Sequence, residues 1–318
     1  MAKKGCLGCS FPIVIGILII FIALFIIGFL AGPIGQKLIP GVHLPEWISV
    51  PRPAPELPAA EVFRLFGQPI TNSIIATWLT IVVVVGFSFT VTRRMKIVPG
   101  RAQAAFEFLL GWVFDLCKSI AGEENGRRFF PIIATIFLFV AFNAWLSLLP
   151  GFGSIEVQVH GHEVELLRGA NTDVNTPLAI ALVSFIFVEF LGLKVLGIGY
   201  LRKFINVGPF FRSVGQIFRG RPREGLSGLF SGFIDIFVGG LEALSEVIRI
   251  VSFTFRLFGN MTAGEILLLI AAFIIPWIFA IPFYGLEILV GFVQALIFSG
   301  LTLVFVTMAV APHEAESH

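Results

Sequence analysis

The chain has 318 residues, of which 57% are hydrophobic and only 13% are charged, and it contains 36 phenylalanines. This composition is too apolar for a soluble globular protein of this length, so it predicts an integral membrane protein. The formal net charge of +2 indicates no nucleic-acid or acidic partner, and three cysteines exclude a disulfide framework.

The N-terminal part predicts a membrane anchor followed by a connector outside the membrane. An apolar run over 11–30 follows two lysines and is longer than the apolar core of a usual signal peptide. We therefore expect a retained anchor at 1–31, with cleavage as the less favoured alternative. Cys6 and Cys9 form a single CxxC motif, which is a weak indication of a metal or redox site, and no metal site is predicted. Residues 32–71 are too rich in proline for a spanning helix.

The next apolar stretches predict three membrane spans, at about 73–92, 131–149 and 177–196, each close to the ~20 residues that a bilayer core requires. Between the first two of these spans, residues 99–125 mix apolar and charged positions at helical spacing. This pattern is typical of an amphipathic helix that lies at the membrane interface.

Basic residues predict the orientation of the chain. They cluster in two segments, one after each of the spans at 73–92 and 177–196, whereas the loop at 151–176 is mainly acidic. By the positive-inside rule, both basic loops are expected in the cytoplasm and the acidic loop on the opposite side. The basic residues are Arg93, Arg94, Lys96, Arg101, Lys118, Arg127 and Arg128 in the first segment, and Lys194, Arg202, Lys203, Arg212, Arg219, Arg221 and Arg223 in the second.

The last two apolar segments are too long to stand upright in a membrane. Residues 240–275 contain no proline and predict a helix of about 54 Å, against a bilayer core of roughly 30 Å, and residues 283–311 are similar. We expect two steeply tilted helices that form a hairpin. The predicted fold is thus an all-α polytopic membrane protein with about six membrane helices and an interfacial helix, in which 72–312 form the membrane domain and 313–318 a tail.

Polar residues inside these apolar segments are candidates for function. An arginine at bilayer depth costs roughly 2.5–3.5 kcal/mol, which makes Arg256 the most informative residue of the chain. With ~100° per residue, it shares one helix face with Glu242, Arg249 and Asn260, whereas Glu265 lies ~180° away and is not expected to pair with it.

Further acidic and polar residues follow on the last helix. Glu287 and Gln294 share a face, so antiparallel packing is expected to bring them near Glu265 and Asn260. The alternative to a functional role is that these buried polar groups only hold the helices together, and this applies chiefly to Gln294. For Glu189, alone in its span, a packing role and a functional role are equally good interpretations. The histidines lie outside the apolar runs, which excludes haem ligation by paired membrane histidines.

Four motifs give the chain a resemblance to a known family. They read NAWLSLLPGF at 143–152, NTDVNTPLAIAL at 171–182, RLFGNMTAGE at 256–265 and PFYGLEILVGFVQALIFSGLTLVF at 282–305. In this order they resemble subunit a of F-type ATP synthases, over most of residues 70–311. The resemblance implies a proton-conducting stator subunit with two offset half-channels, which is not itself an enzyme and carries no cofactor.

The resemblance also implies roles for particular residues. Arg256 matches the family's essential arginine. Glu287 stands where many bacterial members of the family have histidine. The resemblance therefore leaves open the pH range over which the entry half-channel works. The polar channel residues of the family match Asn260, Glu265 and Gln294; a polar motif on the outer side matches Asp173 and Asn175; and polar positions on the cytoplasmic approach match Glu242, Arg249 and Ser252.

Expected partners are the c-ring of rotor subunits, the b-subunit peripheral stalk and the lipid bilayer, in a bacterial plasma membrane. The N-terminal span has no counterpart in the common bacterial pattern, and the sequence leaves open whether the coupling ion is H⁺ or Na⁺. The alternative function is a secondary transporter that binds substrate at the intramembrane charges; such a transporter is expected to have internal repeats, and no second copy of the RLFGNM region is present.

Overall fold

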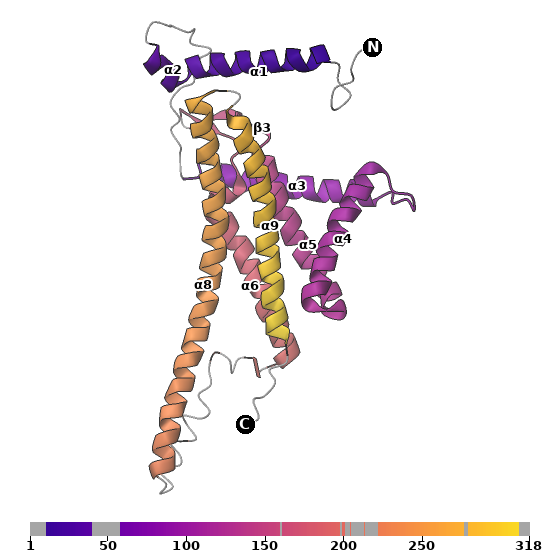
Figure 1. Cartoon of the computed structure of the whole chain (residues 1–318). Coiled ribbons are helices and arrows are strands. Elements are labelled where there is room, and N and C mark those ends of the chain that lie inside the picture. The colour runs from indigo at the N-terminus through magenta and orange to yellow at the C-terminus, as the bar shows by residue number, and fades with distance from the viewer. Residues whose placement is uncertain are drawn as a thin grey trace. The chain divides into compact units, whose positions relative to one another are not determined.

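The computed structural model describes residues 11–39, 58–159, 161–197, 199–200, 204, 213, 222–276 and 279–311 (Figure 1). Cys6, Cys9 and most of the second basic segment lie outside this part of the chain. The helices in it are α1 (Phe11–Ala31), α2 (Pro33–Leu38), α3 (Asn72–Thr92), α4 (Arg101–Ala121), α5 (Glu123–Ser147), α6 (Asn175–Leu196), α8 (Pro222–Ile274) and α9 (Ala280–Val310), with a 3-10 turn, η1 (Ala170–Thr172).

The predicted fold class is confirmed, because α1, α3, α5, α6, α8 and α9 are all long and apolar enough to cross a membrane. The protein is an all-α polytopic membrane protein with two long C-terminal helices. The helix expected over 99–125 is also present, as α4. Its interfacial position, the tilt of α8 and α9, the domain boundaries and the loop orientation remain predictions.

Two helices begin well before the predicted spans. The α8 helix has 53 residues and starts at Pro222 rather than near 240; proline is favoured in the first turn of a helix, where its missing N–H would be unpaired anyway. The α5 helix starts at Glu123 and continues through Pro131, which the sequence analysis had taken as the start of the span. Proline weakens a helix locally without ending it when the surrounding turns are well packed.

Short antiparallel strands, which the sequence analysis did not predict, occur in the segments outside the spans. Strand β1 (Glu61–Leu65) pairs with β2 (Gln68–Thr71) across Phe66 and Gly67, whose φ angles of 51° and 82° are both positive. Positive φ at both central residues is typical of the tight type I′ hairpin turn, and glycine supplies one of them without strain. Strands β4 (Glu156–Val159) and β5 (His162–Glu165) form a second hairpin, and β3 (Pro150–Gly153) precedes them.

The chain divides into two compact units by its internal contacts. Unit 1 contains Met1–Ala76, Asn143–Thr172 and Gly259–Val293, and unit 2 contains Thr77–Phe142, Asp173–Phe258 and Gln294–His318. Within unit 1, Gly28 and Gly32 of α1 lie so close to the backbone of Pro276 and Ile274 that neither has room for a Cβ atom. The rest of α1 is almost entirely exposed and apolar, which fits a helix surrounded by lipid.

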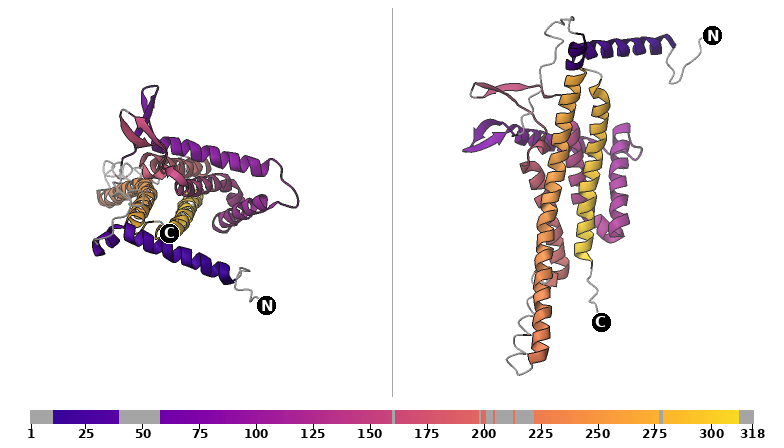
Figure 2. Two further views of the ribbon diagram at one scale, coloured as in Figure 1. Left: turned by 90° about the horizontal axis from the view of Figure 1, so that it is seen from above. Right: turned by 60° about the vertical axis from the view of Figure 1, so that its left-hand side comes forward.

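Aromatic side chains dominate the core of unit 2. Phe129 and Phe137 of α5 are fully buried, and Phe137 meets Trp112 of α4 with ring centroids 6.3 Å apart. Cys117 of α4 is buried in this core, and burial raises the pKa of its thiol to about 11, so it is an inert structural cysteine. The α8 and α9 helices run side by side in opposite directions (Figures 1 and 2).

Candidate functional site

Unit 1 contains a cavity of about 310 Å³ lined by acidic and basic side chains, which we call the outer cavity. Its walls come from the end of α5, the segment before α6, the last turns of α8 and the start of α9. This arrangement brings Glu265 and Glu287 to one cavity, as the sequence analysis expected from antiparallel packing. The other titratable residues in its lining are Glu165, Arg168 and Tyr284.

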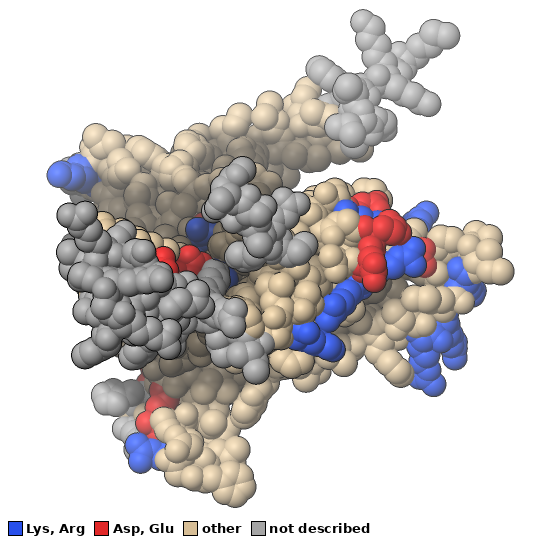
Figure 3. All heavy atoms as spheres, turned by 90° about the horizontal axis from the view of Figure 1, so that it is seen from below, with Lys and Arg blue, Asp and Glu red and all other residues tan. Residues whose placement is uncertain are grey.

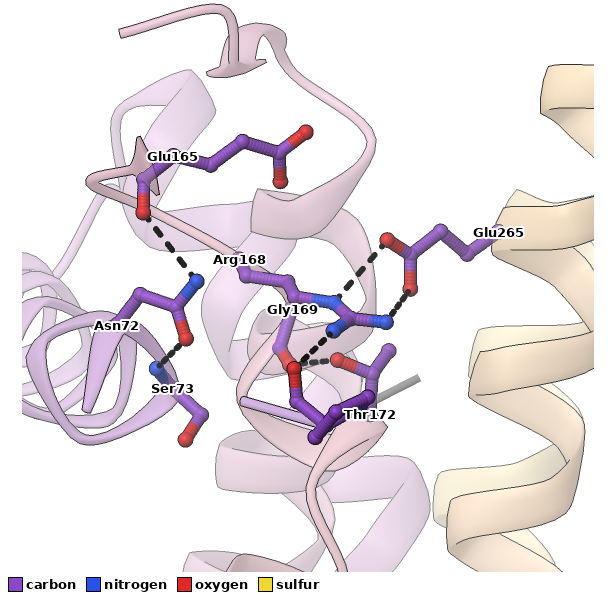
Figure 4. Close-up of polar contacts among 8 residues, drawn as sticks. Asn72, Ser73, Glu165, Arg168, Gly169, Thr172 and Glu265 are labelled. Atoms are coloured by element: carbon purple, nitrogen blue, oxygen red, sulfur yellow. Dashed lines mark hydrogen bonds and ion pairs between the residues drawn. The ribbon is translucent and has the colours of Figure 1, made fainter. Parts of the chain in front are cut away.

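Arg168 forms a two-pronged ion pair with Glu265 (Figure 4). Its Nε donates to Glu265 Oε1 at 3.2 Å and its Nη2 donates to Oε2 at 3.3 Å, while Nη1 donates to the carbonyl oxygen of Pro58 at 3.2 Å. The Arg168 side chain is only 7% exposed, and the Glu265 side chain is 31% exposed. Arginine holds a carboxylate most firmly in this geometry. The sequence analysis assigns no role to Arg168, and the pair is found only in the structure.

The backbone around Arg168 is fixed by short hydrogen bonds. In η1, the Thr172 hydroxyl donates to the carbonyl oxygen of Gly169 at 2.6 Å (Figure 4). On the other side, the buried Asn72 at the start of α3 donates through Nδ2 to the carbonyl oxygen of Glu165 at 3.2 Å. These contacts tie the loop on both sides of Arg168, so its guanidinium is held in the wall of the cavity.

Glu287 is 9% exposed, and its carboxylate lies directly against the backbone of Gly264 on α8. A Cβ at position 264 would overlap that carboxylate, so a larger residue there must displace it. Next to Glu287, the carbonyl oxygen of Ile288 accepts a hydrogen bond from Trp145 Nε1 at 3.1 Å, which anchors α9 to α5. Within the described ranges, no hydrogen bond or ion pair engages the Glu287 carboxylate.

In unit 2, Arg256 is half-buried, and its guanidinium carbon lies 5.9 Å from the centre of the Phe253 ring. Phe253 packs on Phe298 of α9 with ring centroids 4.7 Å apart, which keeps this part of α8 in place. Among the residues that the structure describes, Arg256 has no acidic partner. The expectation that Glu265 does not neutralise Arg256 agrees with the ion pair that Glu265 makes with Arg168.

Arg249 lies in a different setting from the open polar stripe that the sequence suggested. It forms an ion pair with Glu246, and its guanidinium carbon lies 4.0 Å from the centre of the Phe305 ring. Glu246 is 4% exposed and was missed, because it is not among the family-matched polar positions. Glu242 lines a second cavity in this region, while Ser252 is exposed.

The remaining candidates are only partly brought together. Asp173 accepts hydrogen bonds from the backbone N–H and the Nδ2 of Asn175, at 3.1 and 3.0 Å, at the start of α6. Asn260 is exposed and belongs to unit 1, whereas Gln294 is buried and belongs to unit 2. Their expected approach to each other therefore remains a prediction.

We expect Arg168→Gln to destabilise the loop before α6 more than a surface substitution does. Removing one partner of a fully buried ion pair costs about 3–5 kcal/mol, and we expect less here, because the Glu265 side chain that is left uncompensated is 31% exposed. The measurement is the thermal unfolding midpoint of the purified protein in detergent, with exposed Arg94→Ala as the matched control. An additional Glu265→Gln change should recover most of the loss; a double variant as unstable as Arg168→Gln alone would contradict the pairing.

The sequence of the chain is similar to those of known proteins. The sequence model of the family described as "ATP synthase A chain" matches residues 74–307. The chain is 28% identical to "ATP synthase subunit a" of Moorella thermoacetica over 254 residues, which cover 80% of this chain and 97% of that protein. It is 31% identical to "ATP synthase subunit a 3" of Pelobacter propionicus over 72% of this chain and 83% of that protein. The same identity is found with "ATP synthase subunit a" of Desulfosudis oleivorans, over 73% of this chain and 85% of that protein.

Proposed function

Because the chain belongs to the ATP synthase A chain family, we propose that it is the stator subunit that carries protons to and from a rotating ring through two offset half-channels. The protein is a multi-pass bacterial membrane protein and a component of an ATP synthase, active in proton transport. The observation that carries the proposal is the half-buried Arg256, which has no acidic partner among the described residues.

Elementary electrostatics gives Arg256 its role. A ring carboxylate that faces hydrocarbon must be protonated, because an isolated buried ion is very costly. Opposite an arginine at ~4 Å, with an effective dielectric near 20, its ionised form gains roughly 4 kcal/mol, equivalent to about three pKa units. Arg256 therefore releases the proton of an arriving ring site toward the cytoplasm, and the departing site reloads from the outer side.

The outer cavity serves as the proton inlet in this proposal. Its path is Asp173, Glu265, Glu287, Asn260 and Gln294, as the family resemblance implies. Arg168 adds to it a fixed positive charge, which pairs with Glu265, whereas Glu287 makes no ion pair among the described residues. The outlet side contains the second cavity, which Glu242 and Arg249 line, and Ser252, as the family resemblance implies.

The orientation follows from the basic residues. Lys and Arg side chains are prominent on the face drawn in Figure 3, beside acidic ones. With the basic loops in the cytoplasm, the outer cavity opens to the opposite side and the outlet to the cytoplasm. The partners are the c-ring, which meets the Arg256 flank of α8, the b-subunit stalk and the surrounding lipid.

Co-purification tests the proposal against its alternative. The tagged chain should be isolated from membranes together with an oligomeric ring of small hairpin subunits, each with one membrane carboxylate. A secondary transporter would be isolated without such a ring and would bind substrate at the intramembrane charges. Ion flux through the purified complex, measured with and without sodium, then identifies the coupling ion.

Gly264→Ala should slow the inlet without unfolding the chain. The new methyl group displaces the Glu287 carboxylate, which is the far end of a flexible side chain, while alanine itself favours a helix by roughly 0.5–1 kcal/mol over glycine. We expect normal assembly but proton flux lowered about tenfold. This is less than the roughly 10²-fold or more for outright loss of an acid–base group, because the carboxylate is moved and not removed. Gly240→Ala is the matched control on the same helix, because a Cβ there meets open space and the position lies ~160° from Arg256 around the helix. If both variants conduct protons at the same rate, the contact between Gly264 and Glu287 has no role in the inlet.

A further inference from the structure

Four residues of unit 2 form a polar cluster that the proposed inlet and Arg256 do not use; we call it the Tyr200 cluster. Its members are Glu189 of α6, Tyr200 in the segment after α6, and Glu246 and Arg249 of α8. The Tyr200 hydroxyl donates to Glu189 Oε1 at 3.2 Å, and Arg249 pairs with Glu246. Glu189, which fitted no stripe in the sequence, thus has a specific polar neighbour.

Tyr200 enters the Tyr200 cluster as a hydrogen-bond donor. Burial, and then the neighbouring carboxylate of Glu189, raise the pKa of Tyr200 well above its ordinary value, so its phenol stays protonated and donates. Beside this donor lies the ion pair of Glu246 and Arg249. Glu242 adds a further carboxylate at the same cavity, whereas α9 contributes only Phe305, Met308 and Ala309 to the lining, none of which titrates.

Space for water lies next to these groups. Tyr200, Glu242, Glu246 and Arg249 all line a cavity of about 320 Å³. A water molecule occupies roughly 30 Å³ of liquid, so the cavity has room for a short chain of waters among its polar groups. The Glu246 side chain is 5% exposed and the Arg249 side chain 15% exposed, so the pair is nearly buried at the edge of this cavity.

The position of the cluster connects it to Arg256. Glu246 precedes Arg256 by ten residues on the same helix, a rise of ~15 Å, and the segment between them runs toward the end of α8 that we place in the cytoplasm. A proton released beside Arg256 in that direction therefore passes the cavity before it reaches bulk water.

Resting on the proposed function, we propose that Glu246 is a proton-carrying residue of the outlet half-channel, with Arg249 as its fixed counter-charge and Tyr200, which donates a hydrogen bond to Glu189, in the wall of the same cavity. In each passage, a water-borne proton forms an O–H bond on the Glu246 carboxylate. That bond breaks again when the proton leaves to a water on the cytoplasmic side, so no net chemical change remains.

The test is ATP-driven proton pumping by the intact complex in inverted vesicles, normalised to the amount of assembled complex. We expect Glu246→Gln to lower pumping about 10²-fold, the lower end of what a positioned acid–base group contributes, and Glu246→Asp to restore most of it. Exposed Glu124→Gln is the matched control. Pumping by Glu246→Gln equal to that control would overturn the proposal.

A second variant separates proton transfer from stability. Glu246→Gln leaves Arg249 uncompensated, whereas Glu246→Gln with Arg249→Gln removes both charges of the pair. If the pair is only structural, the double variant pumps normally and the inference fails; if Glu246 carries protons, the double variant assembles but stays slow. Arg256→Ala in the same assay tests the proposed function separately. Normal pumping by Arg256→Ala would refute that function, whereas a block there with normal pumping by Glu246→Gln would refute only the role of Glu246.

Discussion

Replacing Arg256 with alanine is expected to abolish both ATP-driven proton pumping and proton-driven ATP synthesis. The guanidinium supplies roughly 4 kcal/mol toward ionising a ring carboxylate at ~4 Å, so its loss lowers the ionised population opposite the stator by about 10³-fold. The described part of the chain gives Arg256 no acidic partner, so its removal leaves no buried carboxylate of this chain uncompensated. Assembly should therefore be preserved.

The control for this variant is Arg94→Ala, which removes an exposed arginine from the loop before α4. Both complexes are compared at equal content of the chain and of the ring. If the Arg256→Ala complex synthesises ATP at the rate of the control, the assigned role of Arg256 is wrong. A complex that lacks the ring would instead show that Arg256 has a structural role.

Neutralising both carboxyls of the outer cavity, with Glu265→Gln and Glu287→Gln together, should slow proton uptake about 10²-fold, the lower end of what a positioned acid–base group contributes. The two side chains line one cavity, so either can pass a proton while the other is neutral. The single variants are therefore expected to lose less than the double variant. The measurement is the initial rate of ATP synthesis after an imposed pH gradient.

The ion pair with Arg168 complicates this experiment, because Glu265→Gln leaves a largely buried guanidinium uncompensated. Adding Arg168→Gln removes that charge as well, so the triple variant separates proton transfer from loss of stability. We expect it to assemble better than the double variant and to remain slow. A triple variant with normal flux and an unchanged pH profile would exclude both carboxyls from the inlet.

Much of the fold was predictable because hydrophobic length reports directly on membrane helices. The spans at 73–92 and 177–196 agree closely with α3 and α6. The start of α8 was missed because its first turns contain several glycines and polar residues, which lower helix propensity, although Pro222 is a helix-start signal. The β1–β2 turn was missed because Phe66 occupies a positive-φ position that asparagine or glycine usually fills.

The candidate site was predictable only along single helices. Helical periodicity grouped Arg249 with Arg256, but it says nothing about which groups from other elements meet them. Arg168 and Glu265 are 97 residues apart, and no spacing rule connects a loop arginine to an acid on α8. An excess of carboxylates over cations near the RLFGNM region was the one available signal that a cation from elsewhere is required there.

The central claim is that the flank of α8 that carries Arg256 meets the carboxylates of the ring. Ser252 and Val251 test it best, because both are exposed, yet they lie ~40° and ~140° from Arg256 around the helix. Each is replaced by cysteine in a chain without its native cysteines, and a cysteine is placed beside the ring carboxylate. Under oxidation, the account predicts that Ser252→Cys forms a disulfide with the ring and Val251→Cys does not. If Val251→Cys forms the disulfide with the ring and Ser252→Cys does not, the Arg256 flank of α8 does not face the ring.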